Sequence, residues 1–118
     1  MLKLTPPTTE PRWLDILDGV RIRVKPVTVA AILVARQAAA DVLKAAGTEA
    51  TIEAGIAFTR SLALQSIEEW EGVGDANGKV VDPDAETIGA LLDIFPAFDA
   101  IDRLFVAPAL TGFEQKNV

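Results

Sequence analysis

The residues best suited to chemistry lie in one acidic stretch, residues 67–84, which reads IEEWEGVGDANGKVVDPD. Its carboxylates could bind a cation or form an acid–base pair, and its glycines could surround a phosphate. A calcium loop needs oxygen ligands at positions one, three, five and twelve, with glycine at six. With Asp75 at position one, Gly78 falls at four and Lys79 at five, so the spacing does not match a calcium loop.

Turns explain this stretch better than a binding site does. It contains neither G-x-G-x-x-G nor G-K-[ST], and no nearby apolar run would bury a carboxyl group and shift its pKa. Asn77-Gly78 is typical of a hairpin turn, and Gly72 is suited to end a helix. Asp82 and Pro83 are suited to begin the next helix, as N-cap and first residue. The sequence therefore predicts a helix end, a small hairpin and a helix start, with no metal or cofactor.

Composition narrows the class of function. The chain has 118 residues, half of them hydrophobic, which suits one domain with a substantial core. It has no histidine, cysteine or tyrosine, so the commonest general base and any Ser-His or Cys-His pair are missing. A net charge of −6 disfavours nucleic-acid binding, and charged residues interrupt the long apolar runs, which disfavours a membrane span. We expect a non-enzymatic, cytoplasmic protein.

Charge is distributed unevenly along the chain. Residues 1–67 carry eight basic and six acidic groups, whereas residues 68–102 carry ten acids and one base. This asymmetry indicates either a solvated acidic face or contact between a basic edge and the acidic half of a neighbouring copy. Under the second interpretation, Arg21, Arg23 and Lys25 are the candidates for self-association, through strand pairing or through the acidic half.

The N-terminal part predicts a flexible arm, residues 1–11, and a β-hairpin, residues 12–25. A two-residue Asp18-Gly19 loop would place an acid on the apolar face of the hairpin. A three-residue loop with a left-handed Gly19 keeps the apolar residues together, and we favour it. The pairs that it predicts are Leu14–Ile22, Ile16–Val20, Asp15–Arg21 and Trp13–Arg23.

About four helices are predicted to follow, so the expected fold class is mainly α (α+β), with the small hairpin between the second and third helices. Thr28 is suited to cap the first helix and Gly47 to end it, while Pro96 opens the last helix and Pro108 closes it. The predicted helices span residues 28–46, 50–71, 83–95 and 96–107, in one globular domain of residues 12–107 followed by a tail of residues 108–118.

The large apolar residues divide into core and partner-binding candidates. Ile52, Ile56 and Trp70 recur at helical spacing, so the second helix is expected to be central and covered on more than one side. The residues of the third and fourth helices that are predicted to face the core are Ile88, Leu91, Leu92, Phe95, Phe98, Ile101, Leu104 and Phe105. Trp70 and Phe95 are the stronger core candidates among the aromatic residues, whereas Phe98, Phe105 and Phe113 are candidates for contacting a partner helix, with core packing as the alternative.

A family resemblance rests on three segments. WEGVGD, followed by Asn77-Gly78 and an acid-capped helix, resembles the tail assembly chaperones of long-tailed phages and gene transfer agents. WLDILDGVRIRVKPVT resembles their N-terminal hairpin, and FPAFDAIDRLF with the terminal QKN resembles their last helix and tail. The residues of the turn motif, to which we assign a structural role, are Trp70, Gly72, Val73, Asp75, Asn77 and Gly78.

The resemblance implies a non-enzymatic assembly factor that binds the helical tape-measure protein, keeps it from aggregating and helps to recruit tail-tube subunits. It also implies a self-associating protein of the host cytoplasm that is absent from the mature particle. Two alternatives stay open at this point. One is a structural protein of the tail or the head–tail connector, and the other is a small acidic metal-binding regulator that uses Asp75.

Overall fold

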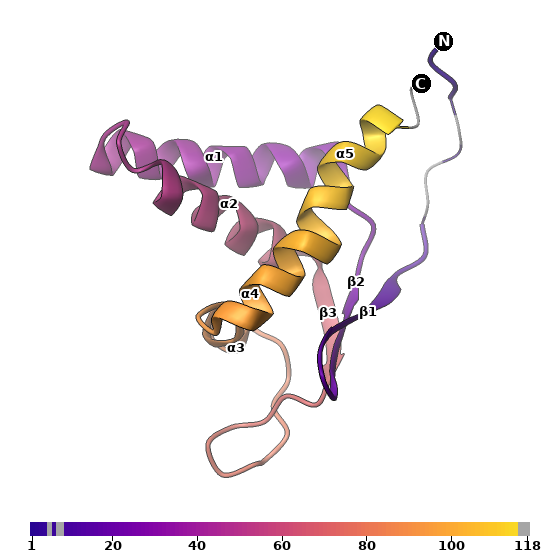
Figure 1. Ribbon diagram of the computed structural model, residues 1–118, viewed down its shortest axis with the longest axis vertical. Coiled ribbons are helices and arrows are strands. Elements are labelled where there is room, and N and C mark those ends of the chain that lie inside the picture. The colour runs from indigo at the N-terminus through magenta and orange to yellow at the C-terminus, as the bar shows by residue number, and fades with distance from the viewer. Residues whose placement is uncertain (5, 7–8, 116–118) are drawn as a thin grey trace.

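The computed structural model describes the backbone of residues 1–4, 6 and 9–115 and the side chains as far as Thr111. An N-terminal hairpin and a third strand form an antiparallel sheet with the order β1-β2-β3, and helices account for most of the remainder (Figure 1). The strands are β1 (Arg12–Leu17), β2 (Val20–Val24) and β3 (Ile67–Glu71). The helices are α1 (Val29–Ala46), α2 (Thr51–Ser66), α3 (Ala85–Leu92), and a continuous C-terminal helix made of α4 (Phe95–Ile101), the π-helical turn η1 (Asp102–Val106) and α5 (Ala107–Gln115).

The register of the hairpin matches three of the four predicted pairs: Trp13–Arg23, Leu14–Ile22 and Asp15–Arg21. The fourth prediction is wrong, because Leu17 rather than Ile16 lies opposite Val20. A bulge at Ile16 shortens the loop to Asp18-Gly19, in which Gly19 has the expected left-handed conformation at φ 76°. The extra residue lets a two-residue loop coexist with an apolar face, and Ile16 remains buried.

The predicted second helix, residues 50–71, is wrong at its C-terminal end. Helix α2 ends at Ser66, and the next five residues form β3, which pairs with β2. The spacing of Ile67 and Trp70 mimics a helical stripe, but a bulge at Glu68 places both residues on the buried face of a strand. Pairing with β3 also provides hydrogen-bond partners for the second edge of β2, which a two-stranded hairpin would leave open.

Helices α1 and α2 form an antiparallel pair that extends sideways from the rest of the molecule (Figure 1). As predicted, the Thr28 hydroxyl caps α1 by accepting a hydrogen bond from the Ala31 amide at 3.1 Å, and Gly47 ends the helix. The prediction that this helix is central and covered on more than one side holds for the second half of α2 only. Leu62, in its second half, is fully buried, whereas Ile52 near its start is 75% exposed.

The third helix is shorter than predicted, spanning Ala85–Leu92 instead of residues 83–95, and its N-cap is Asp84 rather than Asp82. The Asp84 carboxylate accepts a hydrogen bond from the Thr87 amide at 2.8 Å, and the Thr87 hydroxyl accepts one from the Asp84 amide at 2.8 Å. This reciprocal pair favours Asp84 over Asp82, which has no matching residue three positions later. The chain leaves helical geometry at Ile94, so Phe95 does not continue the apolar stripe of α3.

The C-terminal helix is longer than predicted. It begins at Phe95 and continues to Gln115, so Pro108 does not close it and residues 108–115 are not a tail. In the preceding turn η1, the Ala107 amide donates five residues back to Asp102. A wide π-helical turn leaves a carbonyl without an amide partner, and proline, which has no N–H, is tolerated directly after it. The end of the predicted tail, residues 116–118, lies outside the described residues.

The small hairpin between β3 and α3 is confirmed, with a different turn. Gly74 and Val80 form a bridge, and the Gly78 amide donates to the Asp75 carbonyl at 2.9 Å. A two-residue Asn77-Gly78 turn would need positive φ at both positions, but in the described chain only glycines have positive φ. The turn therefore spans four residues and ends in a left-handed Gly78 at φ 79°.

The core lies between one face of the sheet, the second half of α2, and the helices that follow. Its largest fully buried side chains are Phe105, Ile22, Leu62, Ile101 and Val24. Of the predicted core residues, Ile88, Leu91, Leu92, Ile101 and Trp70 are buried and Leu104 is partly buried. Phe95 contradicts its prediction because it is 75% exposed at the start of α4.

Candidate functional site

The arginines predicted for self-association already have partners within the chain. Arg21 binds Glu71 through two hydrogen bonds, Nε to Oε2 at 2.7 Å and Nη2 to Oε1 at 2.9 Å. These bonds lower the pKa of Glu71 and raise that of Arg21. Arg23 contacts Glu68 at 3.0 Å and Glu69 at 2.8 Å. Because β2 has a strand on each side, it has no free edge for strand pairing with a second copy.

The outer face of the sheet is paired from edge to edge. The guanidinium of Arg21 stacks over the Trp13 ring at 4.3 Å from its centroid. Trp13 lies opposite Arg23, as expected, but its stacking partner is the diagonal neighbour, Arg21. The third predicted residue, Lys25, is exposed beyond the end of β2. This face therefore holds the three strands together, and we assign it no binding role.

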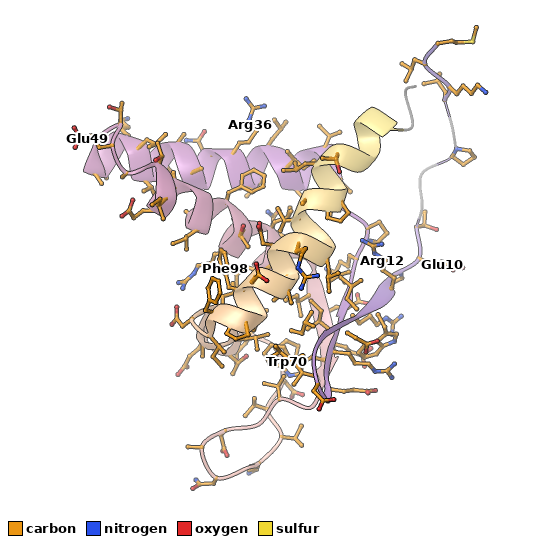
Figure 2. The ribbon with its side chains drawn as sticks, in the orientation of Figure 1. Glu10, Arg12, Arg36, Glu49, Trp70 and Phe98 are labelled. Atoms are coloured by element: carbon orange, nitrogen blue, oxygen red, sulfur yellow. The ribbon has the colours of Figure 1, made fainter. Side chains whose placement is uncertain are left out.

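The residues of the turn motif hold the end of β3 and the small hairpin. The Trp70 indole Nε1 donates to the Val81 carbonyl at 2.7 Å, at the base of the hairpin (Figure 2). Gly72 has φ 82°, and a Cβ at this position would overlap the Gly19 carbonyl. The Asp75 carboxylate accepts hydrogen bonds from the amides of Asn77 and Lys79, each at 2.9 Å. Val73 packs against the core.

The three phenylalanines predicted to bind a partner have different environments. Phe105 is 1% exposed and belongs to the core, so core packing is the correct interpretation for it. Phe98 is half-buried and lies in the angle between α2 and α4 (Figure 2). The side chain of Phe113 lies outside the described residues.

Two isoleucines of α2 are exposed, although sequence reasoning expected this helix to be covered on more than one side. Ile52 and Ile56 occupy the free half of α2, where they are 75% and 43% exposed. The Thr59 hydroxyl donates a long hydrogen bond of 3.4 Å to the Asp102 carboxylate, at a point where α2 meets the C-terminal helix. Ile56 is one helical turn from this contact along α2, and Phe98 is one turn from it along the C-terminal helix. We call Ile52, Ile56 and Phe98 the apolar angle.

The same face of α2 is buried further along, at Thr59, Ala63 and Ser66. The apolar stripe is thus continuous in sequence, but the body of the protein covers only its second half. No local signal distinguishes the two halves, because the burial of each residue depends on where the C-terminal helix crosses α2. The exposure of Ile52 and Ile56 is a property of the tertiary structure.

A second exposed surface lies on α1. Val29, Leu33 and Val34 are each more than half exposed on this helix. A shallow open hollow of about 360 Å³ is lined by Leu33, Arg36, Gln37 and Ala40, all from α1. Arg36 stands on the side of α1 away from the sheet (Figure 2). Its four lining residues lie three or four positions apart, so the hollow is a groove between neighbouring turns of one helix.

Within the described part of the chain, no group of three or more acidic, histidine or cysteine residues gathers where it could hold a metal ion. Among the same residues, no helix combines the length and apolarity needed to cross a bilayer. The features left for a functional role are the apolar angle and the surface of α1, both of which suit binding to another helix.

No protein-family model, curated protein or solved structure matches this chain.

Proposed function

We propose that this protein is a tail assembly chaperone of a phage or a phage-like gene transfer agent. It binds the helical tape-measure protein, keeps that protein soluble and helps to recruit tail-tube subunits. It acts in the cytoplasm of the host cell and is absent from the finished particle. The proposal takes the turn motif and flanking segments as its family link and the apolar angle as its binding surface.

The observation that carries the proposal is the exposure of Ile52 and Ile56 on α2, together with a half-buried Phe98 on α4. An amphipathic helix binds by inserting apolar side chains, spaced three and four residues apart, between the apolar residues of two helices that meet at an angle. α2 and α4 supply such an angle, and the Thr59–Asp102 contact lies where α2 meets the C-terminal helix. A tape-measure protein is a long helix with repeated apolar residues, so one chain would cover one short segment.

The ion pairs on the sheet support assigning the binding role to the helices and a structural role to the sheet. Arg21 and Arg23 meet carboxylates of the same chain, so the sheet stabilises the fold without contacting a partner. The arm formed by α1 and α2 is left as the part that projects from the body with apolar residues exposed (Figure 1).

Co-expression tests the proposal. The chain is expressed with the tape-measure protein encoded beside it, and the soluble fraction is separated by size-exclusion chromatography with light scattering. We expect the partner to become soluble and to elute with several copies of this chain. Elution of this chain as a discrete ring with no partner would favour a structural tail or connector protein. A partner that stays insoluble would contradict the proposal.

The finished particle provides a second test. Mass spectrometry of purified particles is expected to detect the tail-tube protein but not this chain. Recovery of this chain in stoichiometric amounts would contradict a chaperone role and favour a structural one.

A further inference from the structure

The small hairpin, which projects from the body between β3 and α3, has two neighbouring residues at its tip that can react with each other (Figure 1). Asparagine is a thermolabile residue type. Asn77 is exposed, and the residue that follows it is the exposed Gly78, around which a Cβ would meet no atom within 4 Å. Because glycine has no side chain, nothing on Gly78 hinders the approach of its amide nitrogen to the side-chain carbonyl carbon (Cγ) of Asn77.

The reaction that this pair supports is deamidation through a cyclic imide. The Gly78 amide loses its proton to a base in the solvent, and its nitrogen forms a bond to Asn77 Cγ. The bond between Cγ and Nδ2 then breaks, and ammonia leaves with protons taken from the solvent. Water opens the five-membered ring at Cγ to give aspartate, or at the backbone carbonyl carbon of residue 77 to give isoaspartate. The reaction consumes only water.

The closed hairpin hinders the first step of this reaction. The Gly78 amide donates its proton to the Asp75 carbonyl at 2.9 Å, so this hydrogen bond has to break before the proton can leave. The Asp75 carboxylate accepts hydrogen bonds from the amides of Asn77 and Lys79, each at 2.9 Å. A negative charge at this position disfavours a second one on the Gly78 nitrogen. Opening of the hairpin therefore favours formation of the imide.

Contacts at the base of the hairpin oppose its opening. The Trp70 indole donates to the Val81 carbonyl at 2.7 Å, and the Val81 amide donates to the Val73 carbonyl at 3.3 Å. Val73 and Val81 pack against the core, whereas residues 74–80 are all exposed. A segment with exposed backbone hydrogen bonds and few buried contacts opens locally while the rest of the protein stays folded. Weakening the base should therefore increase the open fraction of the tip.

We infer that Asn77 is a site of spontaneous deamidation and that the Trp70–Val81 contact slows the reaction by keeping the hairpin closed. The product has a new carboxylate two residues from Asp75. Isoaspartate also adds one carbon atom to the backbone, which disrupts the turn between Asp75 and Gly78. Modification should therefore loosen the hairpin and leave the core in place. This inference does not depend on the proposed function.

Mass spectrometry of the digested full-length chain, after incubation in mildly alkaline buffer, locates the reaction. Deamidation raises the mass of the peptide that contains residue 77 by about one dalton. Asn117, the other asparagine, is the internal control, because the β-branched side chain of Val118 hinders the same attack. Asn77→Gln is the matched variant, because its longer side chain does not form the five-membered ring. We expect the increase at Asn77 in the wild type and at neither control position.

The rate of the mass increase at Asn77 tests the role of the hairpin. It should be lowest in the folded wild type, up to about tenfold higher in Trp70→Phe, which loses one hydrogen bond, and highest in the wild type unfolded in guanidinium chloride. Circular dichroism will show that Trp70→Phe is folded. Ile52→Ser, which removes an exposed side chain from α2, should react at the wild-type rate.

The comparison with the unfolded wild type does not require any variant to fold. Equal rates in the folded and the unfolded wild type would overturn the inference, because the hairpin would then give no protection. Equal rates in the folded wild type and in folded Trp70→Phe would also overturn it, as would a mass increase at residue 77 that persists in Asn77→Gln. The predicted order of rates, with no increase in Asn77→Gln, would support it.

Discussion

The three-stranded sheet and the arm formed by α1 and α2 differ in whether their exposed side chains have partners within the chain. On the outer face of the sheet, Trp13, Arg21 and Arg23 contact residues of the same chain. On the arm, Ile52 and Ile56 are exposed and are not part of the core. The comparison teaches that charge on a strand need not indicate a binding surface, whereas an apolar helix face without a neighbour can indicate one.

The largest expected effect is on a residue of the central strand. Ile22 is fully buried in β2, so Ile22→Ala should lower the free energy of unfolding by about 3 to 5 kcal/mol. Ile52→Ala, the matched change in the arm, should alter it by less than about 0.5 kcal/mol. Urea denaturation of both variants measures the difference. Similar losses at the two positions would mean that the arm is part of the folding core.

The next effect concerns the close approach of two glycines at the end of the sheet. Gly72→Ala forces a Cβ against the Gly19 carbonyl in a left-handed backbone, which should cost roughly 2 to 4 kcal/mol. Gly78→Ala is the control, because Gly78 has similar φ and open space around it, and only the backbone cost of about 1 to 2 kcal/mol applies. Equal thermal midpoints for the two variants would contradict this packing.

A smaller effect is expected where Trp70 ties the sheet to the small hairpin. Trp70→Phe keeps a buried ring but removes the hydrogen bond to the Val81 carbonyl, which should cost about 1 to 2 kcal/mol. Hydrogen exchange should become faster in residues 73–81 and remain unchanged in α1. Unchanged exchange in the hairpin would show that the indole contact does not hold it.

The smallest effect is the pH dependence of stability. Hydrogen bonds from Arg21 lower the pKa of Glu71, and hydrogen bonds from Thr87 lower that of Asp84. Both folded-state pKa values lie below the unfolded values, so the stabilisation is complete above about pH 5 and is lost as the pH falls through the folded values. Thermal midpoints from pH 6 to pH 3 should fall less steeply in Glu71→Gln and Asp84→Asn than in the wild type. Identical slopes would contradict the ion pair and the cap as sources of stability.

Sequence reasoning succeeded where a local rule decides the structure. The Thr28 cap, the glycine at the end of α1, and three pairs of the hairpin depend only on neighbouring residues. Sequence reasoning failed where contacts between residues distant in sequence decide the local structure. The spacing of Ile67 and Trp70 suits a helix, but β2 recruits them as a strand, and Pro108 stays helical because a π-helical turn precedes it.

The same distinction between local patterns and tertiary contacts applies to the residues of the candidate site. Phe98 was recognised as a possible partner contact, and it is half-buried on α4. Ile52, Ile56 and Phe95 were assigned to the core because their spacing and size fit a buried stripe. Their exposure depends on the crossing of α2 by the C-terminal helix and on the end of α3 at Leu92, which no short pattern encodes.

The central claim is that the apolar angle binds a helix and the sheet maintains the fold, and one measurement tests it directly. Ile52→Ser/Ile56→Ser and the matched control Val29→Ser/Val34→Ser are each co-expressed with the tape-measure protein, and the soluble partner is quantified. The first variant should lose most of the soluble partner while its urea midpoint stays at the wild-type value, and the control should keep both. Full solubility of the partner with the first variant, or equal loss with the control, would contradict the account.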